Sequence, residues 1–177
     1  HAVQTTWSYY SMEKFNWHER EVGISLSVVG VMVAIVQGGL IRKTMPLLGK
    51  ERSVYIGLLL YSVGMILFAI ATEGWMMYAF TVVYCLGGIA GPALQGIISN
   101  HVPPTEQGEL QGGLTSLISL TSIFGPILMT NLFSYFTNKN NPIRLPGAPF
   151  LAGALFMLVS AFLAYRVLYK EKHMKTA

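Results

Sequence analysis

The 177-residue chain is 53% hydrophobic and only 11% charged, and its mean hydropathy of +0.50 lies far from that of soluble domains. Its charged residues fall in clusters that leave long charge-free stretches, and the sequence contains no Asp. This excludes a soluble globular domain. The net charge of +4 comes from basic residues that flank apolar stretches, without the aromatic platform of a strand-binding groove, so no nucleic acid is expected as a partner.

The predicted elements are transmembrane helices of an all-α membrane protein. Residues 1–12 are apolar and aromatic but shorter than the roughly 20 residues that cross a bilayer as a helix. We interpret them as the end of a truncated helix and expect that an upstream part exists, since the chain starts at His1 within a helical pattern and shows no signal peptide. Residues 13–21 follow as an external loop.

Five charge-free stretches after this loop are long enough to span a bilayer, namely residues 22–41, 53–72, 74 to about 102, 110–138 and 145–165. The five-helix remainder of the bundle is therefore assigned to residues 22–168. Residues 169–177 are predicted to form a cytoplasmic tail. The single Cys85 lies within the third stretch, where core packing is its expected role.

The distribution of basic residues predicts the orientation in the membrane. Eight fall on one side of the expected topology: Arg42, Lys43, Lys50, Arg52, Arg166, Lys170, Lys172 and Lys175. Four fall on the other: Lys14, Arg20, Lys139 and Arg144. We therefore expect a multi-pass protein of the cell inner (plasma) membrane with a cytoplasmic C-terminus, and with the loops near Trp17, Glu73 and Asn140 outside. Trp7, Trp17 and Trp75 are predicted at the outer interface.

Glycine and proline interrupt two of the predicted spans. Gly87 and Gly91 are one helical turn apart beside Pro92, and Gly125-Pro126 lies in the next span. Small residues at this spacing allow helices to approach closely, which gives one interpretation: tight packing with a kink. The other is that these residues allow a path-lining helix to bend during transport.

Polar residues inside the spans are the candidate substrate-binding residues, because each is costly in lipid and tends to face a cavity or a partner helix. A Ser or Thr commonly bonds instead to its own helix backbone. No Asp, Glu, Lys or Arg lies deep in a complete span. A proton-coupling acid is therefore expected upstream, unless Glu106 or Glu109 at the cytoplasmic edge takes that role. The candidates are Gln4, Gln37, Tyr61, Tyr84, Gln95 and Ser119.

Signals for an enzyme are absent from the sequence. The four His residues are far apart and lack metal-ligand spacing, and no phosphate-binding loop, dinucleotide fingerprint or nucleophile elbow occurs. We expect no enzymatic activity, no metal and no cofactor.

Three motifs occur in order along the chain: GGIAGPALQG at 87–96, QGELQG at 107–112 and GP at 125–126. Together with residues 15–17, 22–23, Gln37 and 49–52, they resemble the C-terminal half of major facilitator superfamily drug exporters of the tetracycline-resistance type. The resemblance implies a six-helix half of a twelve-helix bundle whose first helix is truncated. It also implies a missing N-terminal half as partner, with a drug site between the halves.

The segment 38–52 resembles the cytoplasmic gating loop of that family. Arg42, Lys43, Gly49 and Arg52 are its candidate residues, with Arg42 and Lys43 near the place of the family's acidic residue. Val33 and Tyr61 stand where tetracycline exporters often carry a histidine and an acid. Tetracycline itself is therefore not assigned as the substrate.

Together these features predict that the chain is half of a proton-coupled exporter of drug-like or amphipathic small molecules, which works by alternating access in the lipid bilayer. Gln37 and Gln95 would anchor the substrate and Tyr84 would offer an aromatic surface. Two alternatives stay open: a nutrient importer or facilitator of the same superfamily, and a membrane scaffold without a transport path.

Overall fold

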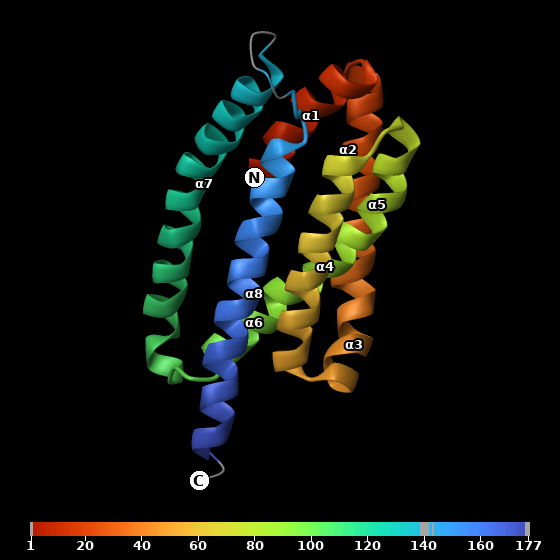
Figure 1. Ribbon diagram of the computed structural model, residues 1–177. Coiled ribbons are helices and arrows are strands. Elements are labelled where there is room, and N and C mark those ends of the chain that lie inside the picture. Colours follow the sequence, from red (N-terminus) through yellow and green to blue (C-terminus); the bar gives the residue numbers. More distant parts are fainter. Residues whose placement is uncertain (1, 139–141, 143, 176–177) are drawn as a thin grey trace.

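The computed structural model describes residues 2–138, 142 and 144–175, and its ordered elements are helices (Figure 1). Along the chain they are α1 (Ala2–Phe15), α2 (Glu19–Ile35), the π-helical turn η1 (Val36–Leu40), α3 (Ile41–Leu48), α4 (Lys50–Ile70), α5 (Gly74–Leu86), the 3₁₀ turn η2 (Gly87–Ile89), α6 (Ala90–Ser99), the 3₁₀ turn η3 (Pro104–Glu106), α7 (Gln107–Thr137) and α8 (Ala148–Lys175).

Five helical segments in the described part of the chain are long and apolar enough to cross a membrane. They are Glu19–Leu48, Lys50–Ile70, Gly74–Ser99, Pro104–Thr137 and Ala148–Leu168. The all-α fold is confirmed, and the five helical segments coincide with the five predicted spans. The boundaries shift by a few residues, and α8 continues as a helix through most of the segment predicted as a tail.

Successive spans run in alternating directions, so the connections gather at two ends of the bundle (Figure 1). The α1–α2 and α4–α5 connections and the start of α8 lie at one end, here called the Trp17 end. The α3–α4 and α6–α7 connections and the C-terminal part of α8 lie at the other, called the Gly49 end. Asn140, expected in an outer loop, and Lys139 lie outside the described residues.

The segment predicted as a gating loop is largely helical, which corrects the expectation. Arg42 and Lys43 lie in α3 and Arg52 in α4, all exposed, and Gly49 alone separates the two helices. Gly49 has φ of +77°, a conformation that glycine adopts without the steric cost of a side chain. One residue therefore reverses the chain, and the charged helix ends extend beyond the apolar spans.

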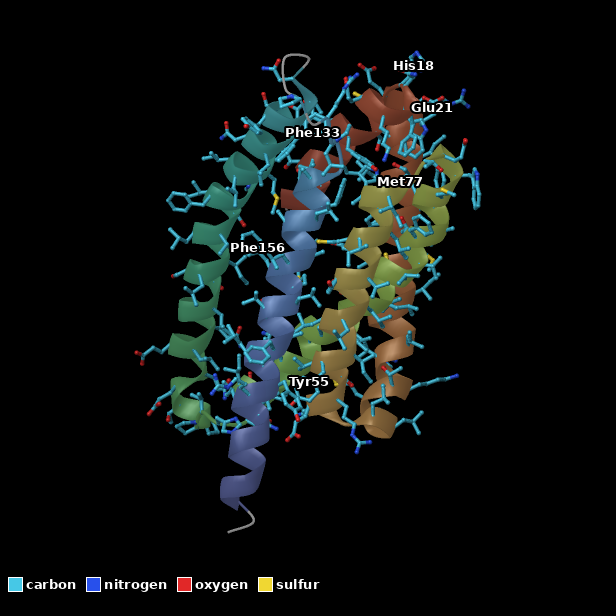
Figure 2. The ribbon with its side chains drawn as sticks, in the orientation of Figure 1. His18, Glu21, Tyr55, Met77, Phe133 and Phe156 are labelled. Carbon is cyan, nitrogen blue, oxygen red and sulfur yellow. The ribbon has the colours of Figure 1, made fainter. Side chains whose placement is uncertain are left out.

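The best-packed region of the bundle centres on α4, which contacts α8, α5 and α6. A buried cluster near the Trp17 end joins α4 to α1, α2, α5 and the start of α8; among its members are Trp7, Tyr10, Phe68, Met77 and Phe150. Met77 is labelled in Figure 2 on the α5 side of this cluster. Aromatic edge-to-face contacts hold it together, with ring centroids of Trp7 and Phe68 4.9 Å apart.

Trp7 is a core residue, so its prediction as an interfacial anchor was wrong. Its side chain is only 3% exposed, and its indole Nε1 donates a hydrogen bond to Ser25 Oγ at 2.9 Å. Trp17 lies in the connection between α1 and α2 and Trp75 in the first turn of α5, both at the Trp17 end, and Trp75 is exposed. A tryptophan near a predicted span end can therefore serve either packing or the interface, and composition does not distinguish the two.

Polar contacts fasten α1 to the neighbouring elements at the Trp17 end. Tyr10 Oη donates to the Phe68 carbonyl at 2.5 Å, and Lys14 Nζ donates to Tyr10 Oη at 2.9 Å and to the Ala69 carbonyl at 3.3 Å. Partial burial lowers the pKa of the Lys14 ammonium below its ordinary value.

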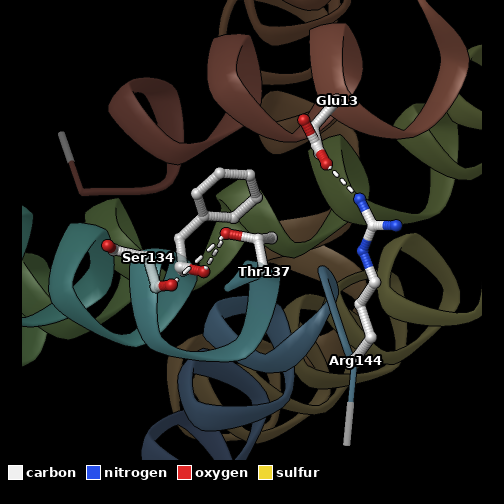
Figure 3. A network of polar contacts seen from close by, with 5 residues as sticks. Glu13, Ser134, Thr137 and Arg144 are labelled. Carbon is white, nitrogen blue, oxygen red and sulfur yellow. Dashed lines mark hydrogen bonds and ion pairs between the residues drawn. The ribbon is translucent and has the colours of Figure 1, made fainter. Parts of the chain in front are cut away.

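Glu13 and Arg144 form an ion pair between the end of α1 and the segment before α8 (Figure 3).

Candidate binding cavity

A cavity of about 670 Å³ lies among α1, α2, α4, α5, α7 and α8. This volume falls in the range of roughly 300–1,000 Å³ that is typical of sites for drug-sized ligands. Aromatic, aliphatic and methionine side chains form most of its lining, together with a few polar groups. Phe156 extends from α8 into the space facing α7 (Figure 2). No residue on the described lining is Asp, Glu, Lys, Arg or His.

Two tyrosines from adjacent helices form the most ordered part of this lining. Tyr61 on α4 and Tyr84 on α5 meet edge to face, with ring centroids 4.9 Å apart, and Phe68 lies 5.5 Å from Tyr84 behind them. The close approach of α4 and α5 sets this geometry. A Cβ atom added to Gly64 would lie 2.8 Å from Tyr84 Cα, so only glycine allows the two helices to come this near.

Gln37 reaches the cavity from η1, where the helix widens by one residue per turn. Such π-helical turns occur frequently at functional sites. The sequence offers one signal that could have located it, because Gly38 and Gly39 follow Gln37 and weaken α-helix formation. η1 lies against η2, so two irregular helix turns meet at one level of the bundle.

The structure places four of the six predicted substrate-binding residues on the cavity: Gln4, Gln37, Tyr61 and Tyr84. Gln95 and Ser119 are not among its lining residues. Gln95 Nε2 donates to Gln111 Oε1 at 3.1 Å, which links α6 to α7 outside the cavity. Ser119 is exposed on α7, whereas Ile118, Thr121 and Ser122 of the same helix line the cavity.

Sequence reasoning did not identify several residues on the lining, chief among them Trp7, Met65, Ser122, Phe156 and Met157. Apolar side chains in a membrane span carry no signal for a cavity, because lipid-facing, packed and cavity-facing positions have the same residue types. Ser122 differs from other hydroxyl residues of α7 only in its position around the helix.

The glycines and prolines predicted for bending and packing take different roles. Gly87 begins η2 and lies against α4: a Cβ atom there would approach Tyr61 Cγ to 2.7 Å. Gly91 has no neighbour within 4 Å of such a position, and Pro92 is exposed in the first turn of α6. The expected interruption of this span is present, as η2.

The second Gly-Pro pair does not interrupt its helix. α7 continues through Gly125 and Pro126 as one α-helix, although proline lacks the N–H that would bond the preceding turn. Gly125 lines the cavity. The span of Gly87 is therefore interrupted by η2, whereas α7 is one continuous helix.

An all-helical bundle whose spans are long and apolar enough to cross a membrane, with a cavity that has no charged residue on its described lining, defines the class as a polytopic membrane protein. Residues 2–177 match the sequence profile of the Major Facilitator Superfamily. The chain belongs to this superfamily, which comprises transporters and not enzymes, and it is a six-helix part of the superfamily's bundle in which α1 is the short helix.

Similar proteins include three from different sources. A class G tetracycline resistance protein from Vibrio anguillarum is 36% identical over 153 residues, covering 86% of this chain and 38% of that protein. A class E tetracycline resistance protein from Escherichia coli is 41% identical over 133 residues, covering 73% and 32%. Hippocampus abundant transcript-like protein 1 from Homo sapiens is 27% identical over 158 residues, covering 81% and 31%.

The chain thus spans between 31% and 38% of the length of these relatives. No solved structure matches it significantly.

Proposed function

We propose that this chain is the C-terminal half of a secondary active transporter in the inner (plasma) membrane that exports drug-like or amphipathic small molecules in exchange for protons. The observation that carries the proposal is the charge-free cavity of about 670 Å³ with Gln37, Tyr61 and Tyr84 on its lining. Its partner is an N-terminal six-helix half, and the substrate binds near the bilayer midplane between the halves. The similarity to tetracycline resistance proteins supports export of an antibiotic-like compound.

In this proposal the cavity wall alternates between the two sides of the membrane as the halves rock. Two features of the chain support movement at its middle. η1 and η2 are turns in which the regular α-helical hydrogen bonding changes, and helix distortions of this kind are common at functional hinges. The basic C-terminal segment and the exposed Arg42 and Lys43 support a cytoplasmic Gly49 end.

Proton coupling is assigned to the rest of the full-length protein. The five spans described contain no carboxylate deep in the membrane, and a coupling group must change its protonation along the pathway. Glu106 and Glu109 are exposed near the start of α7, where they can serve only at the edge of the pathway.

The test is accumulation of a panel of fluorescent amphipathic dyes in cells that produce the full-length protein, with and without a protonophore. The expected result is lower accumulation in energised cells, reversed by the protonophore. The Gln37→Leu variant should export less dye, whereas Val31→Ala, at an exposed position of α2 in the same span, should export normally. Unchanged accumulation of every dye contradicts the exporter proposal.

Two alternatives make different predictions. An importer or facilitator of the same superfamily would raise accumulation or only speed equilibration, which counterflow in proteoliposomes distinguishes from export. A non-transporting scaffold would keep a cysteine introduced at Gln37 inaccessible to aqueous thiol reagents in every state. Cys85 is buried and is replaced by Ala first in that experiment.

A further inference from the structure

We infer that the cavity wall formed by this chain binds the uncharged, flat aromatic part of a ligand and recognises its keto or amide edge through Gln37 and Tyr61. The inference rests on the proposed function, because it concerns the substrate of the same cavity. It names the chemical class of the substrate, which neither the family nor the similar proteins define for this chain.

The charge of the ligand follows from the lining. Moving an ionised group out of water costs several kcal/mol or more unless an opposite charge or several hydrogen bonds compensate it. The described lining contains no acidic or basic side chain to supply that compensation. The part of the ligand that contacts this wall is therefore neutral.

The shape of the ligand follows from the type of apolar side chain. Tyr61, Tyr84 and Phe156 contribute aromatic rings to the lining, and such rings favour stacking or edge contacts with another ring. Met65, Met129 and Met157 complete the apolar lining. Methionine is flexible and polarisable, and its sulfur contacts aromatic rings favourably, so this lining fits flat ring systems of different outlines.

The orientation of the ligand follows from one polar corner. A Cβ atom placed on Gly88 would lie 3.6 Å from Tyr61 Oη and 3.9 Å from Gln37 Nε2, so both polar groups lie near the same buried residue of η2, beside the cavity that they line. Within the described chain, neither side chain makes a hydrogen bond to protein. The Gln37 amide offers both a donor and an acceptor, and the Tyr61 hydroxyl can donate. Together they match a carbonyl group or an amide edge.

The contrast with Gln95 strengthens this assignment. Gln95 has the same side chain, but its amide donates a hydrogen bond to Gln111 outside the cavity. Thr121, which lines the cavity, bonds to carbonyl groups of its own helix at 2.9 and 3.1 Å. Gln37 and Tyr61 keep their hydrogen-bonding capacity for a ligand.

The test compares three compounds with a common three-ring outline on the purified full-length protein in detergent. Acridone is neutral and carries one carbonyl and one N–H, anthracene has no polar edge, and acridone-10-acetate adds a carboxylate. Binding is measured by ligand fluorescence, with the signal from empty micelles subtracted. Wild type is expected to bind acridone more tightly than either of the other two.

The variants separate recognition of the edge from packing. Gln37→Leu and Tyr61→Phe each remove a polar group and keep most of the side-chain volume, so acridone affinity should fall roughly 3- to 10-fold, the usual worth of one hydrogen bond. Anthracene affinity should change less than about 2-fold, because no hydrogen bond to it is lost. Val31→Ala should alter neither.

A third variant tests the corner without removing either polar group. Gly88→Ala places a methyl group at ordinary contact distances of 3.6–3.9 Å, so the fold should tolerate it while the methyl group contacts both Gln37 and Tyr61. Acridone affinity should fall several-fold with little change in thermal stability. Unchanged acridone affinity in Gly88→Ala, or an equal loss for acridone and anthracene in Gln37→Leu, overturns the inference, as does tightest binding of the acetate.

Failure of the inference and failure of the proposed function give different results. If dyes are exported but acridone binding does not respond to the three variants, transport stands and the substrate class is wrong. If acridone binding follows the prediction but no dye is exported from energised cells, the site is correct and the exporter proposal is wrong.

Discussion

α4 and α7 are both long, apolar, charge-poor helices, yet they lie at opposite extremes of packing. In the most apolar 18-residue window of each span, 44% of α4 residues are buried and only 6% of those in the segment that contains α7. Figure 1 shows α4 between α8 and α5 and α7 at the edge of the bundle. Hydrophobicity therefore marks both as membrane helices without indicating which one forms the centre.

The difference arises from where small residues meet a partner. On α4, Gly57 and Gly64 face the backbone of the α5–η2–α6 span so closely that an added Cβ atom would approach it to 2.7–2.8 Å. On α7, Gly112 and Gly113 have nothing within 4 Å of that position. Because lipid is as apolar as leucine, close backbone packing and not hydrophobic burial selects partners within a bilayer.

Hydroxyl groups show the same contrast. Ser62 on α4 donates to the Ala154 carbonyl on α8 at 3.2 Å, across a helix interface. Ser116, Thr121 and Thr130 on α7 donate to carbonyl groups of α7 itself. Hydroxyl side chains therefore link two helices on α4, whereas on α7 these three bond only to the backbone of α7. Four comparisons in the full-length protein, measured as thermal unfolding in one detergent, test how much such contacts between helices contribute: two compare α4 with α7, and two concern the contacts of α1.

The largest effect is expected for glycine substitutions. Gly64→Ala places a methyl group against the Tyr84 backbone, and such overpacking costs about 1–3 kcal/mol in the free energy of unfolding. Gly113→Ala has open space and should stabilise α7 by up to about 1 kcal/mol through its helix propensity. Equal shifts of the unfolding temperature for the two variants would remove the distinction between α4 and α7.

A smaller loss is expected where α1 is fastened to the end of α4. Tyr10→Phe removes the buried hydrogen bond to the Phe68 carbonyl and one partner of Lys14, at a cost of about 1–2 kcal/mol. Tyr9→Phe on the exposed face of the same helix is the control and should leave the unfolding temperature unchanged. A Tyr10→Phe variant as stable as wild type would show that packing alone attaches α1.

The interhelical hydroxyl should contribute less. Ser62→Ala loses the bond from α4 to α8, and interhelical hydrogen bonds in membranes average about 0.6 kcal/mol. Ser116→Ala on α7 removes only a bond to the Gly112 carbonyl of its own helix and should be neutral. If Ser116→Ala loses as much stability as Ser62→Ala, a hydroxyl that bonds to another helix contributes no more to stability than one that bonds to its own helix.

The smallest effect is expected at the exposed ion pair between Glu13 and Arg144, which ties α1 to the approach to α8 (Figure 3). Arg144→Gln should cost roughly 0.2–1 kcal/mol at low salt, because water screens exposed pairs. The loss should disappear at 1 M salt, where the screening length is about 3 Å. The charge-swapped pair Glu13→Arg with Arg144→Glu should restore stability; a loss that persists at high salt would point to a packing role for Arg144.

The candidate site was predictable from the sequence only in part. Gln4, Gln37, Tyr61 and Tyr84 stand out as polar groups in apolar spans, and the structure places all four on the cavity. Gln95 stands out equally, but its partner Gln111 lies 16 residues away on another helix. Ser119 differs from Ser122 only in its direction around α7. The type of a single residue indicates neither its hydrogen-bond partner nor the side of the helix that faces the cavity.

The sequence by itself determined the membrane class, the number and approximate limits of the spans and, by its ordered motifs, the superfamily. These depend on local properties: charge-free length, glycine and proline positions, and basic residues between spans. Only the tertiary structure decided that α4 is central and α7 peripheral, that Trp7 is buried, and that the expected gating loop is helical apart from Gly49. The physical reason is that lipid removes the contrast between inside and outside, so packing depends on matching surfaces of different helices.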